Sequence, residues 1–184
     1  MVIGRETSRA QMSTRPTPRA AKKGRRNAPE AELQLTGFIE KFDPEVATLI
    51  TRTRQAMRKR LPTAFELVYD NYNFFVVGYS ATERASDAIV SITAAANGVG
   101  LCFIRGARLL DPHKLLMGSG KQVRFIRVPS VAVLARPEVD ALIQAACTDA
   151  RTPLREHGRG ALIIKSVSAK QRPRRRRSTP DSSR

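Results

Sequence analysis

Residues 88–105, Ala-Ile-Val-Ser-Ile-Thr-Ala-Ala-Ala-Asn-Gly-Val-Gly-Leu-Cys-Phe-Ile-Arg, contain the strongest local fold signal in the chain. Between residues 89 and 94 two sets of side chains alternate along the chain, as expected for a strand with one face on a core. Asn97-Gly98 follows, and both residues tolerate the positive φ that a type I′ hairpin turn requires. The segment therefore predicts two antiparallel strands, 88–95 and 101–105, joined by a tight turn.

The rest of the chain places helices and strands in separate groups. In the best helix candidate Asp43 is a plausible N-cap, Pro44 occupies the first helical position, and Pro62 follows the last turn. The helix candidates are 31–41, 43–61 and 137–150, and the further strand candidates are 65–69, 74–79, 123–128 and 161–167. Segregated elements favour an α+β two-layer sandwich, in which helices cover one face of an antiparallel sheet, over a doubly wound sheet.

The basic charge of the chain is concentrated at its two ends. Residues 1–29 carry eight Lys and Arg against one Glu, and residues 170–184 carry seven against one Asp, so residues 30–169 hold only +4 of the net +17. Neither end shows the apolar content that would offset the entropy of ordering it. We therefore predict a disordered basic tail over 1–29, one α+β domain over 30–169, and a disordered Arg-rich tail over 170–184.

Composition excludes several classes of protein. Cys102 and Cys147 show neither CxxC nor metal-ligand spacing, so we interpret both as reduced, buried thiols. No apolar run approaches the roughly 18–20 residues of a membrane span. The N-terminus has no hydrophobic region typical of secretion signals, and the prolines in residues 16–29 disfavour a helical transit peptide. We expect a cytoplasmic protein.

The segment 105–127 concentrates polar residues between two strand candidates. Asp111 is a natural cap for a short turn at 112–116. Gly118-Ser-Gly-Lys121 resembles the end of a phosphate loop, but the first glycine of that motif and its final Ser or Thr are missing. The segment is therefore interpreted as a turn that begins the next strand. A weaker alternative is an anion-binding nest of backbone N–H groups near the glycines, assisted by Lys121.

These polar residues, together with the end of the 65–69 strand, form the candidate ligand site. Its members are Asp70, Tyr72, Arg105, Asp111, His113, Gly118, Gly120 and Lys121. The structural alternative for Asp70-Asn71 is a turn capped by its own side chains. Histidine spacing predicts no zinc site. No nucleophile with a partner base is recognised, so an enzyme that uses Asp111 or His113 as a base ranks last, and we predict no catalytic activity.

The basic ends are candidates for contact with phosphate backbones without sequence readout. The candidate residues are Lys22, Lys23, Arg25, Arg26, Arg174, Arg175, Arg176 and Arg177. No aromatic residue is interleaved with them, so the pattern does not indicate base stacking. The alternative is a pair of solvated tails. In a nucleated cell the same runs would suit import signals.

Several motifs resemble those of a known family. They are Gly37-Phe-Ile-Glu-Lys-Phe42, Phe65-Glu-Leu-Val-Tyr-Asp-Asn-Tyr72, Gly78-Tyr-Ser-Ala-Thr-Glu-Arg-Ala-Ser-Asp87, Arg105-Gly-Ala107, Leu110-Asp-Pro-His113, Gly118-Ser-Gly-Lys-Gln-Val-Arg-Phe125 and Ser166-Val-Ser-Ala-Lys-Gln-Arg-Pro173. Over about residues 36–170 the chain resembles the YdhG-like domain family, a bacterial domain of unknown function. The resemblance implies a frataxin-like α/β sandwich and a link to intracellular iron handling.

The sequence departs from the frataxin-like iron-binding pattern, which uses an acidic ridge on the first long helix. Here Glu40, Asp43 and Glu45 lie at the start of that helix, but five cations follow between residues 52 and 60. A cationic surface repels ferrous iron, which disfavours iron carriage. Our leading hypothesis is therefore a non-enzymatic YdhG-like binding domain with an unidentified small ligand or anion. The alternative is a nucleic-acid-associated protein held by its basic tails.

Overall fold

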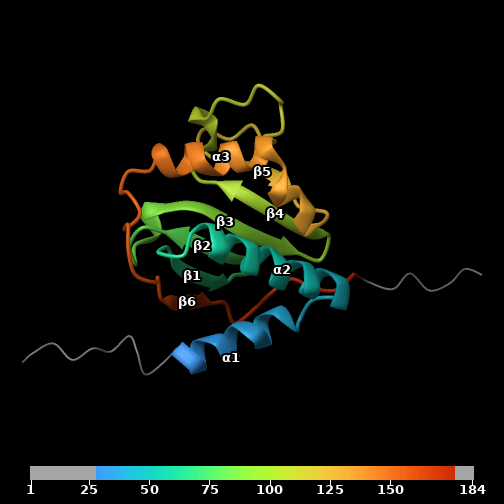
Figure 1. Cartoon of the computed structure of the whole chain (residues 1–184). Coiled ribbons are helices and arrows are strands. Elements are labelled where there is room, and N and C mark those ends of the chain that lie inside the picture. Colours follow the sequence, from blue (N-terminus) through green and yellow to red (C-terminus); the bar gives the residue numbers. More distant parts are fainter. Residues whose placement is uncertain (1–27, 177–184) are drawn as a thin grey trace, which may run out of the picture.

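The computed structural model describes residues 28–176, in which one six-stranded sheet is accompanied by three α-helices (Figure 1). The helices are α1 (Ala28–Ile39), α2 (Pro44–Arg60) and α3 (Pro137–Thr148). The strands are β1 (Phe65–Asp70), β2 (Phe75–Ser80), β3 (Ala88–Ala95), β4 (Gly98–Phe103), β5 (Arg124–Arg127) and β6 (Leu162–Val167). Three short 3-10 helices are η1 (Ala85–Asp87), η2 (Gly106–Arg108) and η3 (Val131–Ala135). The predicted α+β class and the approximate place of every predicted strand and helix are confirmed.

The sheet is mixed, so the prediction of a purely antiparallel sheet was wrong at one edge. The strand order is β5-β4-β3-β2-β1-β6, and β6 runs parallel to β1 while every other neighbouring pair is antiparallel. The chain leaves β5 at one edge, forms α3, and returns at the opposite edge as β6 (Figure 1). Long connections of this kind permit parallel pairing. A strand's own sequence does not state its direction relative to a distant neighbour.

The predicted hairpin of β3 and β4 is present, but its turn is displaced by one residue. Ala95 pairs with Gly98, so the two connecting residues are Ala96 and Asn97, and β4 begins three residues earlier than predicted. Gly98 has a φ of +130°, which a residue with a side chain rarely adopts. The glycine signal was therefore correct, although this residue opens the strand instead of completing a type I′ turn.

The core lies between the sheet and the helices. The ring of Phe75 on β2 lies 6.3 Å from that of Phe38 and 6.1 Å from that of Phe42, measured between centroids. The buried side chains of α2 and α3 join the same cluster. Leu33 of α1 lies outside this cluster and is 75% exposed. The opposite face of the sheet carries smaller and partly exposed side chains, including those of Thr93 and Cys102.

A network of charges joins α1, α2 and β1 inside this fold. The Arg54 guanidinium donates to both carboxylate oxygens of Glu66, at 2.9 and 2.6 Å, and to both of Glu32, at 2.8 Å each. The side chains of Arg54 and Glu66 are only 11% and 6% exposed. Tyr79, which is fully buried, also donates to Glu66 at 3.4 Å. One arginine of α2 therefore fixes the position of α1 relative to the sheet.

The pH dependence of the free energy of unfolding should show how much Glu32 contributes to this network. Hydrogen bonding from Arg54 lowers the pKa of Glu32 below its ordinary value of 4.5. The ionised carboxylate therefore stabilises the fold above about pH 4.5, and this contribution disappears as the pH falls through the lowered pKa. We expect Glu32→Gln to reduce the free energy of unfolding by about 1 kcal/mol at pH 7, because Glu32 is partly exposed. Urea unfolding at pH 7 and pH 2 should show that the difference from wild type vanishes in acid. A deficit that persisted unchanged at pH 2 would contradict the role of the charge.

Candidate functional site

The residues of the predicted ligand site lie at opposite ends of the sheet. Asp70 of β1 pairs with Phe75 of β2, which pairs with Ala94 of β3, and Ala94 pairs with Val99 of β4. Asp70 therefore lies at the end of the sheet where β4 begins. Arg105 follows Phe103 at the other end of β4, and the segment 106–123 extends from there. The single pocket predicted around Asp70, Tyr72, Arg105, His113 and Lys121 was therefore wrong. The antiparallel course of the chain sends the two strand ends in opposite directions.

Asp70 belongs to a buried charge cluster. Its carboxylate is fully buried and accepts from Lys41 Nζ at 2.5 Å and from an Arg174 nitrogen at 3.0 Å. The Arg174 side chain is 3% exposed and lies over the Phe42 ring, 5.6 Å from its centroid. Charges buried in this way need partners, and the Asp70 carboxylate has both cations, although Arg174 Nε is buried without a hydrogen-bond partner of its own. Asp70 therefore holds the fold together and is not open to a ligand.

The C-terminal segment lies against the domain through residue 176, so the predicted disorder was wrong for residues 170–176. The Arg172 N–H donates to the Tyr72 carbonyl at 2.9 Å, and the Arg172 guanidinium lies over the Tyr72 ring. The Arg176 N–H donates to the Asp43 carboxylate at 3.2 Å. Asp43 stands at the N-cap position of α2, as predicted, but makes no capping hydrogen bond with its side chain. We call residues 168–176 the C-terminal strap.

The strap changes the set of candidate phosphate-binding residues. Arg174 is buried on Asp70, so its predicted contact with nucleic acid was wrong. Arg175 donates to the Glu40 carbonyl, and Arg176 donates to the Ala96 carbonyl at 3.4 Å while remaining exposed. The other predicted positions lie outside the described residues: Lys22, Lys23, Arg25, Arg26 and Arg177.

The segment from residue 106 to 123 is a constrained loop, as the turn interpretation predicted. Asp111 accepts hydrogen bonds from the N–H groups of Leu115 and Leu116, at 3.0 and 2.7 Å. Met117 and Phe125 exchange two backbone hydrogen bonds, which close the turn that contains Gly118 at a φ of +104°. Asp111 therefore acts as the predicted cap, and the glycine supplies unusual backbone geometry.

The remaining predicted ligand residues do not converge in this loop. Arg105 pairs with Asp149 at 2.9 Å, beside a small cavity of about 200 Å³. His113 and Lys121 are exposed on the loop. The Gly120 carbonyl accepts a hydrogen bond from the Arg124 guanidinium. An exposed His113 without a buried partner removes the main support for a base in this position.

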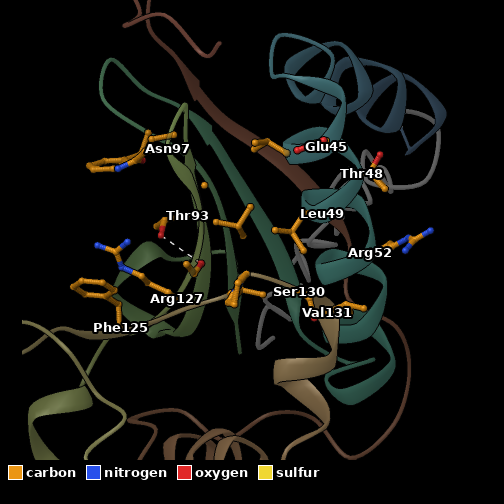
Figure 2. Close-up of a pocket in the computed structure, with 18 of the residues that line it drawn as sticks. Glu45, Thr48, Leu49, Arg52, Thr93, Asn97, Phe125, Arg127, Ser130 and Val131 are labelled. Carbon is orange, nitrogen blue, oxygen red and sulfur yellow. Dashed lines mark hydrogen bonds between the residues drawn. The ribbon is translucent and has the colours of Figure 1, made fainter. Parts of the chain in front are cut away.

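A hollow of about 810 Å³, larger than the cavity beside Arg105, lies around the tip of the β3–β4 hairpin; we call it the hairpin groove. Its lining comes from α2, from the hairpin, from β5 with the segment up to residue 132, from Phe74 and from Arg176. Figure 2 shows Leu49 and Arg52 of α2 on one side of the strands, and Thr93 and Arg127 on the other. The groove therefore extends around the hairpin and is open on both sides of the sheet.

Two glycines of β4, Gly98 and Gly100, line the groove. A Cβ added at Gly98 would have no heavy atom within 4 Å, so this position is open space. At Gly100 a Cβ would come within 3.3 Å of the Thr93 hydroxyl, which itself donates to the Gly100 carbonyl at 3.4 Å (Figure 2). Glycine inside a strand often marks close approach of a ligand or another chain. The Gly98-Val-Gly100 pattern was the one sequence signal for this groove, and the sequence reasoning missed it.

The rim of the groove is basic and its walls are largely apolar. Arg52 and Arg127 are exposed and make no ion pair within residues 28–176, and Arg176 lines the groove beside the hairpin. Among the described residues that line it, Glu45 is the sole carboxylate. Phe74 is 51% exposed there. This combination suits a ligand with negative charge and an apolar part.

The acidic residues offer little to a metal ion. Within residues 28–176, no three side chains of His, Cys, Asp or Glu are grouped as a metal site would require. Glu66 and Asp70, the acidic residues on β1, are bound to Arg54 and to Lys41 with Arg174. These carboxylates would have to give up buried cations before they coordinated iron.

Comparisons with known proteins add no further assignment. No family model, curated protein or solved structure matches this chain. In the part of the chain that the structure describes, no helix is both long and apolar enough to cross a membrane.

Proposed function

We propose that this chain is a non-enzymatic binding domain, and that its ligand is an organic anion with an apolar part held in the hairpin groove. The observation that carries this proposal is the pairing of free guanidinium groups, on Arg52 and Arg127, with apolar walls in a hollow of about 810 Å³. Arginine suits carboxylate, sulfonate and phosphate groups because its planar fork donates two hydrogen bonds at once. The apolar walls would cover the rest of the ligand.

We also propose that the chain is YdhG-like, with a frataxin-like sandwich. The motifs within residues 36–170 support this proposal, and the six-stranded sheet with its helices is compatible with it. Iron is the less favoured ligand under this proposal, because cations follow the acidic start of α2 and because Glu66 and Asp70 are already paired. An anionic ligand fits the basic rim better.

The fluorescent anion 8-anilinonaphthalene-1-sulfonate tests the groove, because it combines a sulfonate with aromatic rings. We expect the full chain to bind it, and Arg127→Gln to weaken binding about tenfold, the usual order for one hydrogen bond to a charged group. The affinity of Arg52→Gln for the probe, measured in the same titration, shows whether the α2 side of the groove contributes to binding. The measurement is fluorescence at increasing probe concentration, with the folded state checked by circular dichroism.

Arg159→Gln is the matched control, because Arg159 is exposed and lies beside Gly160, whose N–H donates to Pro62 at the far end of α2. It removes the same charge from the protein without touching the groove. Equal weakening by Arg159→Gln and Arg127→Gln would indicate a general charge effect and would overturn the proposed site. Loss of the probe signal only in the groove variants would support it.

A second candidate function is association with nucleic acid, which the net charge of +17 favours. Residues 28–176 carry 23 Lys and Arg against 14 Asp and Glu, and five of these cations belong to residues 170–176, which lie against the domain. Electrostatic binding to phosphates falls steeply with salt, and this dependence distinguishes it from binding of a small apolar anion.

A further inference from the structure

We propose that the hairpin groove binds a single strand of nucleic acid, with bases on its aromatic side chains and phosphates on its arginines. The inference rests on the proposed function, because it names the ligand class of the same groove. Three features carry it: the charge of the rim, the aromatic side chains of the walls, and the strap that holds Arg176 at the groove.

The charge of the groove matches a polyanion on both sides of the hairpin. Arg127 lies on one side of the strands and Arg52 on the other (Figure 2). Arg176 lines the groove between α2 and the hairpin turn, held by Asp43 and by the Ala96 carbonyl. A compact anion would reach one of these cations, whereas an extended chain of phosphates would pass all three.

Aromatic side chains in the same groove supply the stacking surfaces that the basic segments lack. Phe74 precedes β2 and Phe125 lies on β5, so the fold brings them into the groove from positions 51 residues apart. Phe74 is half exposed, and Figure 2 shows Phe125 beside Arg127. Bases of a single strand stack on such rings, and the contact tolerates any sequence. A duplex would keep its bases paired and away from these rings.

The strap holds Arg176 at this groove. The buried Arg174 anchors the strap on Asp70, and Arg176 follows at the rim. The strap therefore adds a third cation to the groove, supplied by a segment that the sequence assigns to a separate tail.

The test is fluorescence anisotropy of a labelled 20-nucleotide oligothymidine with the full chain at several salt concentrations. We expect Phe74→Ala to weaken binding about fivefold or more without changing the net charge, because one stacked base would be lost. We expect Arg127→Gln to lower the slope of log affinity against log salt by about 0.7, the contribution of one phosphate contact on a single strand. Both variants retain the basic ends.

Two matched controls separate the groove from the rest of the basic surface. Leu110→Ala removes an apolar side chain that is 90% exposed on the loop after β4, and Arg159→Gln removes an exposed cation far from the groove. Both should bind the oligonucleotide more tightly than the corresponding groove variant does. Wild-type affinity and salt slope in both Phe74→Ala and Arg127→Gln would overturn the inference and would assign any binding to the chain ends.

Competition with the sulfonate probe distinguishes failure of this inference from failure of the proposed function. If the probe binds in the groove but oligothymidine neither displaces it nor responds to Phe74→Ala, the nucleic-acid inference is wrong and the small-anion proposal stands. If the oligonucleotide responds to the groove variants while the probe does not bind, the inference holds and the small-anion proposal is wrong. If neither ligand responds to groove variants, both fail.

Discussion

Replacing Arg54 with methionine is expected to lower the free energy of unfolding by about 3–5 kcal/mol. The substitution leaves Glu66, 6% exposed, without the guanidinium that binds both its carboxylate oxygens, and Tyr79 is its other buried donor, at 3.4 Å. The main cost is desolvation of a buried carboxylate whose nearest remaining cation is the half-exposed Arg58, with its Nε 3.6 Å from Glu66. Urea denaturation at pH 7, followed by circular dichroism, measures the loss.

Arg58→Met is the matched control for this prediction. Arg58 lies one turn further along α2 and contacts Glu32 at 3.1 Å, but its side chain is 46% exposed. Exposed ion pairs contribute about 1 kcal/mol or less, so this variant should remain close to wild type. The double variant Arg54→Met, Glu66→Leu should recover stability relative to Arg54→Met, because it removes the orphaned charge. A double variant no more stable than Arg54→Met would contradict the explanation.

The second large effect is expected at Asp70, where Asp70→Asn should release the C-terminal strap. The substitution leaves Arg174, 3% exposed, without its carboxylate, at a cost of about 3 kcal/mol. Without this ion pair the strap can lift away and return Arg174 to water while the sheet stays folded. Hydrogen exchange measured by mass spectrometry should show lost protection in residues 168–176 before any change in β3.

Asp43→Asn provides the comparison for the strap. Asp43 accepts one hydrogen bond, from the exposed Arg176, and its loss should cost little and affect only the end of the strap. If Asp70→Asn left residues 168–176 as protected as in wild type, the buried cluster would not be what holds the strap. The same variant should weaken oligonucleotide binding if the strap presents Arg176 to the groove.

Local sequence patterns were sufficient to predict where the elements of this fold lie. Alternation over residues 89–94 and a glycine after Asn97 identified the β3–β4 hairpin, and Pro44 and Pro137 marked the first turns of α2 and α3. These signals act within a few residues, because strand and helix periods and turn geometry are local properties. Asp111 as a cap belongs to the same class of prediction.

The candidate site depended on contacts between distant residues, and sequence reasoning misplaced it. Asp70 and Arg174 are 104 positions apart in the sequence, yet they form a buried ion pair. Asp70 was predicted to bind a ligand and Arg174 to contact phosphate, but both are parts of the core. Arg105 was grouped with Asp70 although the strands carry them to opposite ends of the sheet. The sequence next to each of these residues does not indicate which distant residue it contacts.

The sequence by itself determined the α+β class, the order of the elements and the strongly basic character of the chain. Only the tertiary structure decided that β6 runs parallel to β1, that residues 168–176 form a strap, and that Phe74, Phe125 and Arg52 line one groove. The physical reason is that periodicity and capping are set by neighbouring residues. Strand direction, charge pairing and the shape of a groove are set by packing between segments that are far apart along the chain.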